Sequence, residues 1–147
     1  MRDVKHVAEV MTAPVVAVGR LAPYEEIARL LIKHQISGLP VVLVDQRVAG
    51  VISEADLVIA RDKDAWRARA RTTAGPHRHG LQPRPVKLAG ELMTAPALTI
   101  HPDETVATAA QMMTAHRVGR LPVVAKDGTL IGIVSQGDLL GALASAG

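Results

Sequence analysis

Apolar and polar residues follow the same succession of patterns twice along this chain. In the first half, an apolar stripe at helical spacing over residues 27–31 follows a proline and two glutamates, which suit the first turn of a helix. Apolar β-branched runs at 39–44 and 48–52 then predict two strands joined by a turn. The second half repeats these elements at 106–113, 121–125 and 130–134. Each set is preceded by a short apolar lead-in helix, a Thr-Ala-Pro step that ends it, and a short strand predicted at 15–18 or 97–100.

Identical residues support this internal repeat. Three blocks recur at one offset of 82 residues: 10–14 with 92–96, 39–42 with 121–124, and 50–57 with 132–139. Alignment of residues 10–57 with 92–139 requires no gap and gives 15 identities in 48 positions. Three separated blocks in one register are a strong repeat signal, because chance similarity would not hold the spacing.

The repeated unit predicts an α+β fold. Each unit has the order helix–β–α–β–β–α, and about 50 residues give too small a core for independent stability. We therefore expect two β-α-β-β-α repeats, related by pseudo-two-fold symmetry, to form one module. The expected parts are residues 1–62 (first repeat with its lead-in helix), 63–85 (basic helix and loop linker) and 86–147 (second repeat).

Composition narrows the class of protein. The 147 residues are 48% hydrophobic and 21% charged, a balance typical of a globular domain. There are no cysteines, which excludes disulfides, thiolate catalysis and cysteine-ligated metals. No apolar stretch approaches the roughly 20 residues of a membrane span, and the N-terminus does not resemble a signal peptide. We therefore expect a cytoplasmic protein that is not bound to a membrane.

Positive charge is concentrated between the repeats. Residues 58–90 hold eight Lys/Arg against two Asp, whereas the rest of the chain holds nine against twelve acidic residues. Nucleic-acid binding through 58–90 is therefore an alternative function. It is less favoured, because acidic residues interrupt the arginines and the only aromatic residues are Tyr24 and Trp66. Trp66 is expected to anchor its helix by packing.

The repeated motifs resemble those of a tandem pair of cystathionine β-synthase (CBS) domains, often called a Bateman module. The resemblance rests on a Met-Thr-x-Pro step, a Leu-Pro-Val-Val strand and a Gly-h-h-Ser-x-x-Asp-Leu exit (h is apolar), each present in both repeats. It implies a regulatory module that binds an adenosine-containing molecule, such as AMP, ADP, ATP or S-adenosylmethionine, between its repeats. It also implies a homodimer that controls an effector protein. Because the chain ends eight residues after Leu139, we expect a stand-alone pair with a separate effector.

The Ser-x-x-Asp motif follows the last strand of each repeat and provides the first candidate ligands. Its residues are Ser53 with Asp56, and Ser135 with Asp138. A strand-to-helix junction offers backbone N–H groups and the positive end of a helix dipole, and a carboxylate there can accept hydrogen bonds from a ribose diol. The resemblance likewise assigns the Asp to ribose and the Ser to ribose or phosphate. The same motif is also a capping box that merely closes the helix, and both interpretations remain open.

The resemblance assigns further residues to the pocket for the base. They are Thr12, Pro14 and Val16, their counterparts Thr94, Pro96 and Leu98, and the strand prolines Pro40 and Pro122. For the prolines, helix termination and a strand start are the alternative roles.

Arg120 is the candidate phosphate ligand. The resemblance places a basic residue near this position in members that bind phosphorylated ligands. The corresponding residues of the first repeat are Ser37 and Gly38. The two clefts are therefore expected to differ, and one of them to stay empty or to take an uncharged ligand.

Catalysis has little support in the sequence. There is no Walker loop and no Gly-x-Gly-x-x-Gly, Gly-x-Ser-x-Gly or His-Glu-x-x-His motif. His77 and His79 lack neighbouring acidic ligands and are interpreted as a solvated loop, so no metal site is predicted. We predict a non-enzymatic sensor with no resident cofactor, whose regulatory ligand is an adenine nucleotide or S-adenosylmethionine. The alternatives are an interaction or dimerisation scaffold with empty clefts and, third, the nucleic-acid binder.

Overall fold

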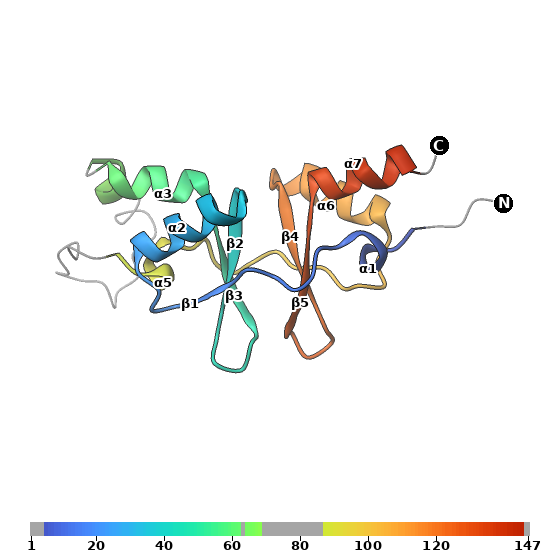
Figure 1. Cartoon of the computed structure of the whole chain (residues 1–147), viewed down its shortest axis with the longest axis horizontal. Coiled ribbons are helices and arrows are strands. Elements are labelled where there is room, and N and C mark those ends of the chain that lie inside the picture. The colour runs from blue at the N-terminus through green and yellow to red at the C-terminus, as the bar shows by residue number, and fades with distance from the viewer. Residues whose placement is uncertain (1–4, 63, 69–86, 146–147) are drawn as a thin grey trace.

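The computed structural model describes residues 5–62, 64–68 and 87–145. Elements of the first half are α1 (Val7–Val10), β1 (Val18–Gly19), α2 (Tyr24–His34), β2 (Gly38–Val42), β3 (Val48–Ser53) and α3 (Glu54–Arg61). Those of the second half are α5 (Ala89–Leu92), α6 (Val106–His116), β4 (Arg120–Val124), β5 (Leu130–Ser135) and α7 (Gln136–Ser145). The predicted α+β class and the two repeats are confirmed, and the halves lie side by side with α2, α3, α6 and α7 above and the hairpin tips below (Figure 1).

Each repeat is built on an antiparallel hairpin. Strand β2 pairs with β3 and, on its other side, runs parallel to β1. In the second repeat β4 pairs with β5, and Ile100 forms a parallel bridge to Val123 where β1 has its counterpart. Both hairpins carry a register shift at the matching position, between Val41 and Val42 and between Val123 and Val124.

The long helices follow the sequence signals. In α2, Ile27 and Leu31 are buried one turn apart, and the helix ends at Gln35, whose left-handed backbone (φ 53°) closes it. In α6, the side chain of Thr105 caps the helix by accepting a hydrogen bond from the Thr108 N–H at 3.1 Å. Helix α6 has the matching left-handed residue at its end, so both helices stop in the same way.

The two repeats exchange their lead-in helices. Helix α1 lies against the second repeat, where the Val7 N–H donates to the Glu104 carbonyl at 2.8 Å. Helix α5 lies against the first repeat, where the Ala89 N–H donates to the Ala22 carbonyl at 2.8 Å. The chain therefore crosses between halves after each lead-in helix, as the two long connecting segments show (Figure 1).

This crossing corrects one sequence expectation. The strand predicted over 15–18 is reduced to Val18–Gly19, and its counterpart over 97–100 is a single bridge at Ile100. The reason is that Thr12 still pairs with the second repeat while Val18 already pairs with the first, so the residues between them span the gap. The boundary at residue 62 stays a prediction, and the lead-in helix in that segment serves the other repeat.

Each repeat has its own core, completed by the exchanged helix. The first contains Val18, Ile27, Leu31, Leu39, Val41, Ile52, Leu57, Ala60, Trp66, Ala89 and Leu92. The second contains Val7, Ile100, Ala109, Met113, Leu121, Val123, Val134 and Leu139. Trp66 lies in the first core with the Lys87 ammonium 5.3 Å from its ring centre, which confirms its packing role. The linker loop predicted at 72–85, with His77 and His79, falls outside the described residues.

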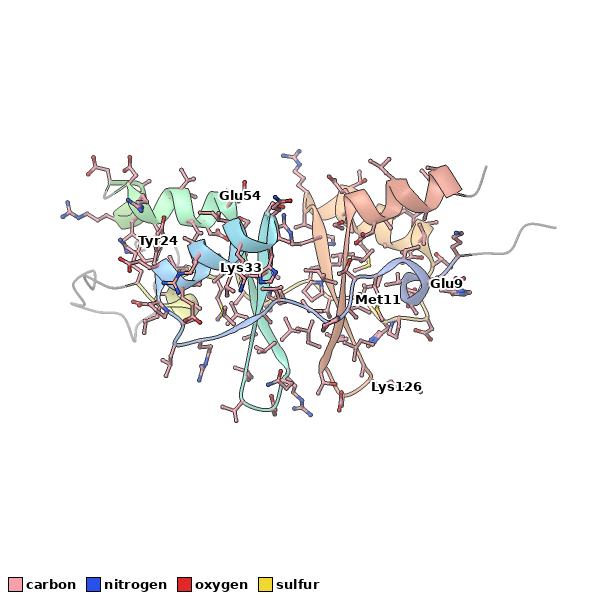
Figure 2. The ribbon with its side chains drawn as sticks, viewed as in Figure 1. Glu9, Met11, Tyr24, Lys33, Glu54 and Lys126 are labelled. Carbon is pink, nitrogen blue, oxygen red and sulfur yellow. The ribbon has the colours of Figure 1, made fainter. Side chains whose placement is uncertain are left out.

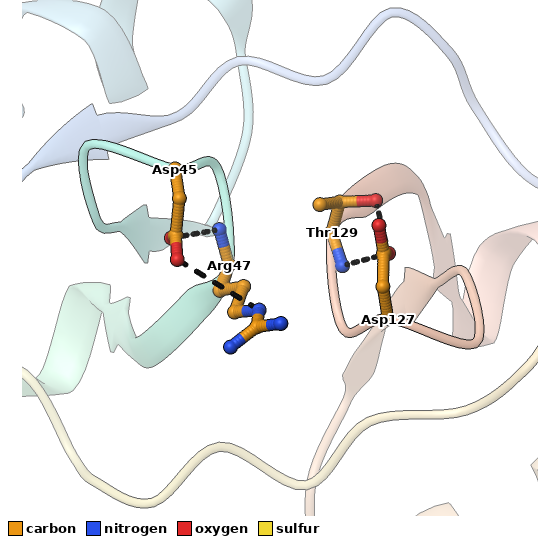
Figure 3. Close-up of polar contacts among 4 residues, drawn as sticks. All are labelled: Asp45, Arg47, Asp127 and Thr129. Atoms are coloured by element: carbon orange, nitrogen blue, oxygen red, sulfur yellow. Dashed lines mark hydrogen bonds and ion pairs between the residues drawn. The ribbon is translucent and has the colours of Figure 1, made fainter.

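The hairpin tips form a second contact between the halves. Two backbone hydrogen bonds join them, from Leu130 N–H to the Gln46 carbonyl (3.0 Å) and from Val48 N–H to the Gly128 carbonyl (3.4 Å). Each turn is closed by its own aspartate (Figure 3): Asp45 accepts from the Arg47 N–H, and Asp127 accepts from the Thr129 N–H and hydroxyl. The halves are thus tied together at their tips as well as through the lead-in helices.

Candidate functional site

Both Ser-x-x-Asp motifs form capping boxes. At the start of α3, Asp56 Oδ2 accepts a hydrogen bond from the Ser53 N–H at 2.8 Å, and the Asp56 N–H donates to Ser53 Oγ at 3.3 Å. At the start of α7, Ser135 and Asp138 make the same two bonds at 2.8 and 3.2 Å. The structural alternative for this motif is therefore observed in both repeats.

A carboxylate that caps a helix can also accept hydrogen bonds from a ligand, because it has about four acceptor sites on two oxygens. In both motifs Oδ2 accepts the Ser N–H, and at Asp56 it also accepts the Ser53 hydroxyl at 3.1 Å. Helices α3 and α7 both begin at the seam between the repeats and run away from it, so their positive dipole ends face the same region (Figure 1). A ribose role for Asp56 and Asp138 is compatible with this arrangement and stays a prediction.

Strand pairing brings several candidates into two rows. Thr94 pairs with Val51 on β3, and Val51 pairs in turn with Pro40 on β2. Val51 lies two residues before Ser53, so this row leads to the first corner, the junction of β3 and α3 at residues 53–56. The second corner is the junction of β5 and α7 at residues 135–138. In the second row, Thr12, Ile133 and Pro122 pair in the same way and lead to Ser135. Each Thr-Ala-Pro step therefore serves the repeat on the other side of the seam.

The candidates for the base pocket differ in exposure. Those of the Thr-Ala-Pro steps, Thr12, Pro14, Thr94 and Pro96, are exposed. Val16 and Leu98 are half-buried, against the first and the second core respectively. Pro40 and Pro122 are fully buried inside their strands, so a ligand could touch them only if their neighbours moved. Their assignment as walls of a pocket stays a prediction.

Arg120 contacts both corners, the second through its backbone and the first through its side chain. Its backbone pairs with Ser135 at the start of β4, next to the second corner. Its side chain crosses the seam, where Nη2 donates a hydrogen bond to Ser37 Oγ of the first repeat. Gly38 makes room for it, since a Cβ there would lie 2.5 Å from Nη1 of Arg120. The second repeat therefore places a cation beside Ser37 of the first repeat, and the expected difference between the two clefts stays a prediction.

The electrostatics of the first corner centre on this guanidinium. Partial burial lowers the pKa of Arg120 from its ordinary value, and the nearby carboxylates of Glu54 and Asp56 oppose that shift. Asp56 is itself buried, and Glu54 is exposed at the start of α3 on the side facing the second repeat (Figure 2). The corner thus combines two carboxylates, one guanidinium, a hydroxyl and a helix N-terminus.

Three residues of this arrangement were missed in the sequence. Val51 and Ile133 link the Thr-Ala-Pro steps to the strand prolines, and their signal was the pair of apolar residues before each Ser-x-x-Asp. Glu54 was also missed, although its counterpart Gln136 lacks a charge and the difference was visible in the alignment.

A groove of about 630 Å³ lies between α2 and α3. Its lining is mainly apolar, but Ser37 and Glu54 contribute to it, so the groove reaches the residues around Arg120. The described residues bring together no group of three or more His, Cys, Asp or Glu side chains that could hold a metal. No helix within the described part of the chain is long and apolar enough to cross a bilayer.

The fold and the repeated corners define a known class of protein. The family model for the CBS domain matches residues 7–63 and 89–145. The chain belongs to the CBS domain family and contains two such domains in tandem.

One curated relative and two solved structures match nearly the whole chain. The uncharacterized protein MJ1426 of Methanocaldococcus jannaschii is 30% identical, over 96% of this chain and 92% of its own length. Among solved structures, CBSX2 of Arabidopsis thaliana in complex with AMP has a TM-score of 0.76 at 28% identity, covering 96% of this chain and 97% of that chain. The CBS domain pair of protein MJ0100, in complex with 5′-methylthioadenosine and S-adenosyl-L-methionine, has a TM-score of 0.72 at 25% identity and covers 95% and 99%.

Other curated relatives are longer chains. This chain spans 53% of a chloroplast CBS protein and 24% of an inosine-5′-monophosphate dehydrogenase, so the match to that enzyme is partial.

Proposed function

We propose that this chain is a regulatory module that binds an adenosine-containing ligand at the seam between its CBS repeats. The observation that carries the proposal is the pair of strand-to-helix corners whose helices start at one seam, each with an aspartate at the helix N-terminus. Solved CBS pairs of similar fold that contain AMP, or 5′-methylthioadenosine and S-adenosylmethionine, support the ligand class.

In this proposal different residues of the two corners bind different parts of the ligand. Asp56 and Asp138 accept hydrogen bonds from ribose hydroxyls while their helices stay capped, and the Thr-Ala-Pro steps contact the base. A bond to a charged group contributes about 1.5–3 kcal/mol, enough to orient a small ligand. The ligand shifts the conformation of the pair only as far as its affinities for the two shapes differ, and this shift reaches an effector protein. The chain itself catalyses no reaction in this proposal.

Thermal unfolding with a ligand panel tests the proposal. AMP, ADP, ATP, S-adenosylmethionine and NADH are each added to the full chain. A ligand at 100 times its Kd adds about 2.7 kcal/mol, which raises the Tm of a protein of this size by roughly 5–11 °C. We expect Asp56→Asn or Asp138→Asn to weaken the effect while preserving the cap, because an asparagine oxygen still accepts the Ser N–H. A panel without any shift contradicts the sensor and favours the scaffold with empty clefts.

The proposal includes a homodimer formed through the helical side. Large apolar side chains are exposed on three helices of that side: Ile32 on α2 (78%), Val58 on α3 (69%), and Leu140 (66%) and Leu143 (68%) on α7. The groove between α2 and α3 is lined by two of them and can receive a side chain of a second copy. Sedimentation analysis tests this: Ile32→Glu with Leu140→Glu should give monomers, whereas Val44→Glu, at the exposed hairpin tip, should leave the dimer intact.

Nucleic-acid binding remains the less favoured alternative. It predicts a steep loss of affinity with salt that depends on the arginines of residues 58–90. The cytoplasmic location expected from the sequence is likewise part of the proposal.

A further inference from the structure

We propose that Arg120 is a latch between the repeats, closed onto Ser37 in this structure, and that an anionic ligand opens it. The latch is the hydrogen bond from the Arg120 guanidinium of the second repeat to the Ser37 hydroxyl of the first, fitted into the space beside Gly38. This inference rests on the proposed function for the identity of the anion, and on the geometry of the seam for the latch itself.

The first step is that the Arg120–Ser37 hydrogen bond forms at the first corner and has no equivalent among the residues of the second. Arg120 and Gly38 occupy equivalent positions of the two repeats, 82 residues apart. The guanidinium fills the space that a side chain at Gly38 would need, with Cζ 2.7 Å and Nη1 2.5 Å from the position of a Cβ. At the second corner the equivalents of Ser37 and Glu54 are Gly119 and Gln136, which offer neither the hydroxyl nor the charge. One latch is therefore formed, and it ties the second repeat to the first.

The second step is that the described groups around the guanidinium are a hydroxyl and carboxylates, with which an anion can compete. The guanidinium is partly buried, and burial lowers the pKa of Arg120 while the two carboxylates favour its charge. Guanidinium binds phosphate oxygens through two N–H groups in one plane, so a phosphate competes with the Ser37 hydroxyl for it, and the nearby charge of Glu54 opposes the phosphate.

The third step links this exchange to the conformation of the pair. The chain segment of the latch includes the Ser37 carbonyl, which accepts the Glu54 N–H at 2.9 Å and so ties the start of β2 to the start of α3. When the guanidinium turns to an anion, Ser37 loses its bond to the other repeat. The anion thus changes the coupling between the two halves, with a strength set by the difference between the two sets of contacts.

Calorimetric titration with AMP and with adenosine tests the latch, because these probes differ by the phosphate alone. Ser37→Ala and Glu54→Gln release the guanidinium, so both should bind AMP more tightly than wild type, by about three- to tenfold. Arg120→Met removes the cation and should weaken AMP by about tenfold or more. Adenosine should change less than twofold in all three variants. Arg117→Met, which removes the same charge three residues away at an exposed position, is the matched control and should leave AMP unchanged.

The outcomes separate the latch from the proposed function. If AMP binds the wild type but Ser37→Ala and Glu54→Gln leave its affinity unchanged or lower it, the latch is overturned and the sensor stands. If the wild type binds neither probe, the sensor is overturned, and with it the opening of the latch by an anion. A double-mutant cycle of Ser37→Ala and Arg120→Met on urea unfolding tests the closed latch without ligand, and additive effects would overturn it.

Discussion

The two repeats share one framework, yet they differ where they meet. Each has the same hairpin, the same capped helix and a lead-in helix taken from its neighbour. At the seam, the first corner has Glu54 and a guanidinium received from the second repeat, whereas the second corner has Gln136 and faces Gly38. An internal repeat therefore predicts equal frames and does not predict equal sites.

The position near the pseudo-two-fold axis explains why the sites differ. Gly38 and Arg120 are equivalent residues that lie against each other across the seam. Two arginines there would place like charges in one partly buried space, and two glycines would leave no cation. One of each fills the space, so the symmetry is broken by packing as much as by charge.

Among the tests of the comparison between the two repeats, the largest change in the free energy of unfolding is expected in the exchanged lead-in helices. Leu92 of α5 is fully buried in the core of the first repeat, whereas its counterpart Val10 is only partly buried against the second. We expect Leu92→Ala to lower the free energy of unfolding by about 2–5 kcal/mol. Val10→Ala should cost about 1 kcal/mol, because less apolar area is lost.

Urea unfolding followed by circular dichroism measures both values, and hydrogen exchange locates the damage. Leu92→Ala should loosen the amides around Leu39 and Ile52 in the first repeat, not those of the second repeat to which it belongs in sequence. Loss of protection in the second repeat would contradict the exchange of helices.

The next effect compares the two capping aspartates. Asp56→Ala should cost about 2 kcal/mol and Asp138→Ala about 1 kcal/mol, because both lose a cap but only the first leaves a partly buried guanidinium without its carboxylate. Urea unfolding at pH 7 measures the difference. In an Arg120→Met background the difference between the two costs should become smaller, and an unchanged difference would show that Arg120 does not cause it.

Most of the frame was predictable from the sequence, because it depends on local patterns. The helix at 106–116 and the hairpins follow from apolar periodicity and β-branched runs, and the Ser-x-x-Asp motif gave both caps. The 82-residue offset paired the equivalent residues correctly. These features require no knowledge of how the halves are joined.

The contacts across the seam were not predictable in this way. Nothing local distinguishes a lead-in helix that packs on its own repeat from one that packs on the other, since the apolar stripe of Val7 and Val10 suits either core. The direction of the Arg120 side chain depends on the empty space at Gly38, which is 82 residues away. Long-range packing therefore decided the parts of the site that differ between the repeats.

The smallest effect compares the two hairpin turns (Figure 3). Asp45 is paired with the Arg47 guanidinium at 3.7 Å, whereas Asp127 accepts the Thr129 hydroxyl at 2.7 Å. Hydrogen bonds from the hydroxyl and N–H of Thr129 lower the pKa of Asp127 below its ordinary value of 3.8. A lowered carboxyl pKa stabilises the folded turn above pH 3.8, and this contribution is lost as the pH falls through the folded pKa.

Thr129→Ala should therefore raise the pKa of Asp127 toward 3.8, because the largest cause of the shift is the hydroxyl. Thr129→Ser retains the hydroxyl and is the matched control, so its pKa should stay near that of the wild type. Titration of the carboxyl carbon by NMR measures both variants. Since Asp127 is fully exposed, the change should appear in the titration and not in the urea midpoint at pH 7. No rise in either variant would assign the shift to the backbone N–H and to Arg47, which would make the two turns alike.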